Sequence, residues 1–200
     1  GVKGYILKPV KEEEVVEKVN KLIREIDDKA DKLDIKEQVE SKIKVVMPLI
    51  ENELISSFIS GNFEIEKVES YINLLQAEIK SGYFMLISPG QYYSKDINDS
   101  IRNRILKDKI FGIAEKHLPL MKKCYFGNSI GNTIIAFFPI NEGASMSEIH
   151  NEAVLVGNEI KSRIKVIAGL EVAVGIGTAY SSIQNLSRSY NEANFALRKA

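Results

Sequence analysis

The stretch Lys122–Pro139 reads KKCYFGNSIGNTIIAFFP and decides the centre of the fold. Two apolar runs, Lys122–Asn128 and Asn132–Pro139, lie on either side of the turn residues Asn128–Gly131. Aromatic and β-branched runs that flank Asn and Gly are typical of a β-hairpin. We therefore predict two antiparallel strands that are neighbours in the sheet.

The segments around the hairpin alternate between strand and helix patterns. Upstream, the continuous apolar run Tyr83–Ser88 (YFMLIS) predicts a buried strand that ends at Pro89-Gly90. The remaining predicted elements are a helix over Lys95–His117, a helix over Ser145–Ile167, a strand over Glu171–Thr178 and a helix over Ser182–Ala200. Ser145 and Glu148 have the spacing of a capping box, which marks a helix start.

From Tyr83 onward the order of elements is thus β, α, β, β, α, β, α. This order fits an α/β fold of the α+β kind, with a mixed, largely antiparallel sheet of ferredoxin-like type. We expect the helices to cover one face of that sheet.

The N-terminal third is rich in charge and has a narrow apolar stripe at helical spacing. Lys and Arg number 27 and Asp and Glu also number 27, and many of these residues lie before residue 61. The stripe fits a heptad over Val15–Leu33 and then slips, and Pro48 is expected to kink or restart the helix. Gly61-Asn62 should end it, and Ile65–Ile79 should form a further amphipathic helix. A solitary surface helix is the alternative, but such a stripe favours self-association as a coiled coil.

Composition limits the classes of function. The formal net charge is zero, which argues against nucleic-acid binding by this segment. A single cysteine, Cys124, excludes an intrachain disulfide and a cysteine-based zinc cage. The sequence has no stretch long and apolar enough for a membrane span and no signal-peptide pattern, so we expect a cytoplasmic protein without membrane association.

The most specific short string is Gly4-Tyr5-Ile6-Leu7-Lys8-Pro9-Val10, followed by a Glu-rich helix. It resembles the last strand and helix of two-component receiver domains. The resemblance implies that Lys8 pairs with a phosphoryl group, that Pro9 follows a cis peptide bond, and that Tyr5 is the aromatic residue that moves on activation. An ordinary Lys-Pro turn is the alternative. The resemblance covers residues 1–26 alone, so we expect the body of the receiver to be missing.

The closing string Val172–Ala200 resembles the end of GGDEF-type domains, in which a V-S-I-G strand leads to a helix of the L...SY.EA..AL type. The matching residues here are Val174-Gly175-Ile176-Gly177, Leu186, Ser189-Tyr190, Glu192-Ala193 and Ala196-Leu197. The resemblance covers about residues 60–200. It is similar to the variety of this domain that lies between receiver and AraC-type helix-turn-helix domains, so we expect a DNA-binding domain beyond this chain.

The resemblance also locates the residues that would carry catalysis. Diguanylate cyclases hold Mg²⁺ with carboxylates on the first strand and at the hairpin. Here Gly131, Asn132, Thr133 and Ile134 replace Gly-Asp-Glu-Phe, and no acidic residue occurs in Lys122–Phe138 or Lys80–Lys95. Asn and Thr are not anionic ligands, so we predict no enzyme activity, no cofactor and no metal site.

Other residues have weak functional signals. His117 and His150 lie on predicted helices without converging ligands, so we expect surface or partly buried histidines. Cys124 lies on a strand, where a buried inert thiol is usual.

Two glycines and two aromatic pairs could have either a functional or a structural role. Gly175 and Gly177 fall inside a strand, which favours close backbone packing over phosphate binding. Tyr92-Tyr93 and Tyr125-Phe126 are residues of a binding face or, more commonly, of the core.

These observations predict three segments: a receiver remnant over residues 1–26, a helical linker over 27–62 and a degenerate GGDEF-like domain over 63–200. The leading hypothesis is a non-catalytic signalling and dimerisation segment of a response regulator that controls transcription. The expected partners are a second copy through the linker helix, a sensor histidine kinase through the missing receiver body, and DNA through the missing domain. A small-molecule sensor and, less favoured, an active diguanylate cyclase are the alternatives.

Overall fold

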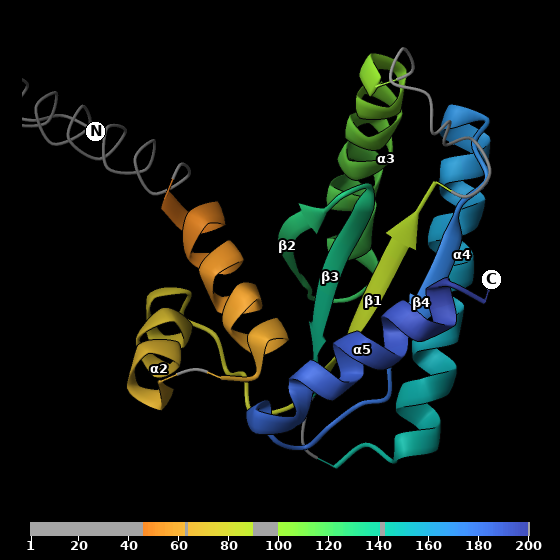
Figure 1. Ribbon diagram of the computed structural model, residues 1–200. Helices are drawn as coiled ribbons and strands as arrows, with labels where there is room; N and C mark the ends of the chain where they lie inside the picture. Colours follow the sequence, from red (N-terminus) through yellow and green to blue (C-terminus); the bar gives the residue numbers. More distant parts are fainter. Residues whose placement is uncertain (1–45, 63, 90–99, 141–142, 200) are drawn as a thin grey trace, which may run out of the picture. The chain divides into compact units, whose positions relative to one another are not determined.

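The computed structural model describes residues 46–62, 64–89, 100–140 and 143–199 (Figure 1). The chain divides into a unit of residues 1–46 and a compact unit of residues 47–200. The sheet and the helices that cover it belong to the second unit. Tyr5, Lys8, Pro9, the Tyr92-Tyr93 pair and the heptad region lie outside the described residues.

Four strands form one sheet in the order β2-β3-β1-β4. Their bounds are Gly82–Ser88 for β1, Tyr125–Ile130 for β2, Thr133–Pro139 for β3 and Ala173–Ile176 for β4. Each neighbouring pair is antiparallel, and β1 lies between β3 and β4. This is the strand order of a ferredoxin-like split βαβ fold, so the predicted α+β class is confirmed.

The helices connect and cover these strands (Figure 1). A helix over residues 46–60 comes first, and the others are α2 (Ile65–Leu74), α3 (Ser100–Met121), α4 (Met146–Ala168) and α5 (Leu186–Leu197), with a short 3-10 helix at Ile183–Asn185 before α5. The predicted capping box begins α4: Ser145 Oγ accepts a hydrogen bond from the Glu148 N–H, and the Glu148 carboxylate accepts one from the Ser145 N–H. The helix ends at Gly169, whose left-handed φ of 68° suits glycine.

Helices cover both faces of the sheet, so the expectation of one covered face is wrong. On one face Tyr83, Met85 and Ile87 pack against α3 and α4. On the other, Phe84 and Leu86 pack against α5, α2 and the helix over residues 46–60. This explains the continuous apolar run in β1. Consecutive residues of a strand point to opposite faces of the sheet, and here both faces are buried.

Several predicted boundaries differ by a few residues. One boundary is as predicted: the helix over residues 46–60, which contains Pro48, stops before Gly61, whose φ is 66°. The α2 helix ends at Leu74 rather than Ile79, because Gln76 takes a left-handed φ of 48°. That reversal lets Ile79 enter the core, where it is buried.

Candidate functional site

The hairpin tip is a two-residue turn between β2 and β3. Ile130 pairs with Thr133, so Gly131 and Asn132 form the turn, whereas the sequence predicted a turn from Asn128. An irregularity in register between Gly127 and Ile130 extends β2 toward the tip. Gly131 is exposed and has a left-handed φ of 61°, which glycine adopts without strain.

Gly131, Asn132, Thr133 and Ile134 thus lie at the tip of this hairpin and at the start of β3. Asn132 and Thr133 are half-buried, and Ile134 is fully buried between the sheet and its helices. Neither of the two polar side chains carries a charge. No group of three or more His, Cys, Asp or Glu side chains suited to a metal ion occurs within the described ranges.

The Ser-Tyr-x-Glu-Ala residues of α5 hold that helix onto the sheet. Ser189 is completely buried, and its Oγ accepts a hydrogen bond of 3.0 Å from the backbone N–H of Phe84 in β1. Tyr190 packs edge-on against the ring of Phe84, with 5.7 Å between the ring centroids. Both contacts fix α5 on the centre of the sheet.

Glu192 fixes the loop that follows β4. Its two carboxylate oxygens accept hydrogen bonds from the Thr178 N–H (2.8 Å) and the Tyr180 hydroxyl (2.6 Å). Desolvation alone would raise the pKa of Glu192, but these two hydrogen bonds, aided by Arg188, lower it below the usual range. The carboxylate is thus a structural acceptor for the loop.

Close packing of α5 on β4 explains the two glycines of the strand region. A Cβ atom at Gly175 would lie 2.1 Å from the Ala193 carbonyl oxygen, and one at Gly177 would lie 2.0 Å from the Ser189 carbonyl oxygen. Both distances are far below van der Waals contact. The prediction that these glycines serve backbone packing is confirmed.

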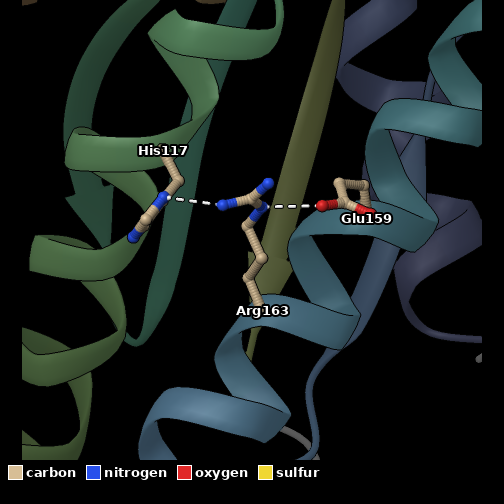
Figure 2. A network of polar contacts seen from close by, with 3 residues as sticks. All are labelled: His117, Glu159 and Arg163. Carbon is tan, nitrogen blue, oxygen red and sulfur yellow. Dashed lines mark hydrogen bonds and ion pairs between the residues drawn. The ribbon is translucent and has the colours of Figure 1, made fainter.

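The two histidines have structural surroundings. Figure 2 shows His117 on α3 and Arg163 on α4, where Arg163 Nη1 donates to His117 Nδ1 at 3.2 Å and Arg163 Nε donates to Glu159 at 2.7 Å. Accepting at Nδ1 places the proton of a neutral imidazole on Nε2. His150 is exposed on α4. This network bridges two helices and supplies no converging ligand set.

A groove of about 430 Å³ lies beside the edge strand β2. One wall comes from the helix over residues 46–60 through Pro48 and Glu51, and the other from α3 through Asp108, Phe111 and Glu115. The floor is formed by Cys124, Phe126 and Gly127 of the β2 region. The volume falls in the range of about 300–1,000 Å³ that small-molecule sites occupy.

Gly127 allows the first wall to approach the sheet. A Cβ atom at this residue would lie 2.4 Å from Ile55 Cγ2, so the missing side chain lets Ile55 pack directly on the strand. Ile55 is buried, and it anchors the helix over residues 46–60. The narrow spacing of helix and strand thus depends on this glycine.

Two ionisable groups of the groove have shifted pKa values. Desolvation raises the pKa of Glu51, the nearby Glu115 carboxylate raises it further, and a hydrogen bond from the Phe126 backbone N–H opposes the change. Burial raises the pKa of the Cys124 thiol to about 12. A raised pKa disfavours the reactive thiolate. The expected position is wrong in two respects, because Cys124 is half-buried rather than buried and lies just before β2 rather than on a strand.

Sequence reasoning missed this groove. Tyr125 is buried in the core, as predicted, but Phe126 lines the groove and packs edge-on against Phe111 at 5.7 Å between centroids. One signal was present: Glu51 precedes the buried Leu54 and Ile55 at helical spacing, which places an acid on the apolar face of its helix.

Comparisons with known proteins identify one domain. The GGDEF-like domain family matches residues 106–198, from α3 to just beyond α5. A GGDEF-like domain is therefore present at these residues, and a comparison with curated proteins gives no match. In the part of the chain that the structure describes, no helix has the length and apolar character needed to cross a membrane.

Proposed function

We propose that this chain is a non-catalytic signalling and dimerisation segment of a two-component response regulator. In this proposal its GGDEF-like domain relays a signal and makes no cyclic dinucleotide. The observation that carries the proposal is the hairpin tip, which presents Asn132 and Thr133 and no carboxylate. By the sequence resemblance, these two residues replace the Asp and Glu of a diguanylate cyclase. A cyclase needs those carboxylates to hold Mg²⁺.

The remaining parts of the proposal rest on the sequence. The Tyr5, Lys8 and Pro9 string supports a receiver that a sensor histidine kinase phosphorylates. The heptad over Val15–Leu33 supports a homodimer, since a narrow apolar stripe requires a partner helix. The similarity to regulators with AraC-type domains supports transcription control in the cytoplasm, with DNA bound by a domain outside these residues.

The decisive test of the catalytic part is incubation of the chain with GTP and Mg²⁺, followed by anion-exchange chromatography. We expect unchanged GTP, whereas an active diguanylate cyclase assayed in parallel shows that the conditions support the reaction. Formation of a cyclic dinucleotide by this chain would overturn the proposal.

The dimer is tested by analytical ultracentrifugation of the whole chain. We expect a dimer for the natural sequence and a monomer for Leu22→Glu, because a charge in the centre of the stripe opposes helix pairing. A monomer at high concentration for the natural sequence would contradict the dimerisation part.

The groove beside β2 favours small-molecule sensing as a second candidate function. Its volume lies in the range of small-molecule sites, and its lining combines apolar and carboxylate side chains. A thermal-shift screen with nucleotides and other metabolites tests this candidate, and a chain that no compound stabilises would exclude it.

A further inference from the structure

The groove beside β2 has an excess of negative charge. Three carboxylates line it, those of Glu51, Asp108 and Glu115, against one ammonium group, that of Lys107. Among the described residues none of the three carboxylates takes part in an ion pair. A phosphate-bearing nucleotide would meet repulsion from these side chains, whereas a cation would be attracted.

The same groove offers apolar surface. Phe111 and Phe126 line it and meet edge to face, and Pro48 and Pro119 also belong to its lining. Aromatic faces attract organic cations, and the apolar lining suits the carbon skeleton that carries the charge. A hydrated inorganic ion would gain little from such a lining, because it interacts mainly with oxygen ligands.

Glu51 and Glu115 come from opposite walls, and their mutual repulsion is a further reason to expect a cation between them. The Glu51 carboxylate is half-buried, accepts a hydrogen bond from the Phe126 N–H, and has a pKa that desolvation and Glu115 raise. A positive group placed in the groove would offset both effects. The cavity itself is the primary observation, and the carboxylates determine the class of its ligand.

We propose that the groove formed by the helix over residues 46–60, α3 and β2 binds a small organic ammonium compound, with its charge at Glu51 and Glu115 and its carbon skeleton on Phe111 and Phe126. This inference rests on the second candidate function, small-molecule sensing, and names the chemical class of the ligand. It is independent of the cyclase question, since GTP conversion and amine binding are measured separately.

The test is an NMR titration of the whole chain with 1,5-diaminopentane at low ionic strength, with 1,5-pentanediol as the neutral compound of matched length. We expect saturable shifts at the amides of Phe126 and Gly127 with the diamine and none with the diol. Glu51→Gln and Glu115→Gln should each lower the affinity about tenfold or more, because each removes a charged hydrogen-bond acceptor. The matched control, Glu69→Gln, removes the same charge from an exposed position of α2 and should leave the affinity unchanged.

Four results would overturn the inference: no saturable shift with the diamine, equal binding of the diol, equal affinities for the natural chain and both groove variants, or a loss of binding in Glu69→Gln as large as in both groove variants. Glu115 is exposed, so Glu115→Gln tests the site in a folded chain even where Glu51→Gln disturbs the Phe126 contact. An equal loss in Glu69→Gln would indicate attraction to the overall charge of the chain rather than a site in the groove.

Discussion

Gly175→Ala is the substitution that most directly tests how α5 is mounted on the sheet. The new Cβ would lie 2.1 Å from the Ala193 carbonyl oxygen, 2.7 Å from the Leu197 nitrogen and 2.8 Å from the Leu197 Cβ. The first two of these are backbone atoms, which no rotamer change can move. Since carbon and oxygen atoms normally approach to about 3.3 Å, α5 must shift away by about 1 Å.

The loss of stability can be estimated from the contacts that this shift of α5 disturbs. Overpacking in a well-packed core costs about 1–3 kcal/mol, and here the obstacle is rigid backbone. The same shift weakens the hydrogen bond between Ser189 and Phe84, which contributes about 1 kcal/mol. Replacing glycine also reduces the entropy of the unfolded chain, which offsets about 0.5–1 kcal/mol. We expect a net loss of about 1–3 kcal/mol in the free energy of unfolding.

Urea unfolding followed by circular dichroism measures this loss, with Gly112→Ala as the matched control. Gly112 lies within α3, and a Cβ atom there would meet nothing within 4 Å. Alanine is a better helix former than glycine, so this control should gain about 0.5–1 kcal/mol. Unfolding free energies of the two variants within about 1 kcal/mol of each other would refute the close packing of α5 on β4.

Two further predictions concern the side chains of α5. Ser189→Ala should lower the free energy of unfolding by about 1–3 kcal/mol and speed hydrogen exchange at the Phe84 amide, because that buried N–H loses its acceptor. The control, Ser56→Ala at an exposed position, should change neither quantity. The pKa of Glu192 is lower in the folded chain than its value of about 4.5 in the unfolded chain, so the ionised carboxylate stabilises the fold. This stabilisation is present above pH 4.5 and is lost as the pH falls through the folded-state pKa. The difference in unfolding free energy between the natural chain and Glu192→Gln should therefore be constant near pH 7 and shrink below pH 4.5, and a difference that grows on acidification would contradict the assigned hydrogen bonds.

The fold was largely predictable because its elements carry local signals. The hairpin, the capping box at Ser145 and the order of strands and helices each follow from short-range patterns. The covering of both sheet faces was missed although a signal existed, since the run YFMLIS in β1 has no polar face to offer to solvent. The end of α2 was missed because Gln76, unlike glycine, gives no warning of a left-handed conformation.

The groove was not predictable, because three segments distant in the sequence create it. Glu51, Glu115 and Phe126 share no motif, and their meeting depends on Gly127, which brings a helix onto the edge strand. A glycine in a strand suggests close approach of another backbone or side chain, but it does not say which one. Sites assembled by tertiary packing alone leave such indirect traces in the sequence.

The residues that mark the GGDEF-like domain and the residues at its hairpin tip have separate tasks in this chain. Ser189 joins α5 to β1, and Glu192 joins it to the loop after β4. Gly175 lets α5 pack closely on β4. Changes at these residues therefore alter the stability of the whole domain. Asn132 and Thr133 lie at a turn, half-exposed and outside both hydrophobic clusters, so substitutions there leave the packing of the core unchanged. The fold therefore places no requirement on carboxylates at the tip. A chain with this architecture can keep every contact that identifies the domain whether or not it holds Mg²⁺, and its activity must be judged from the hairpin rather than from the family match.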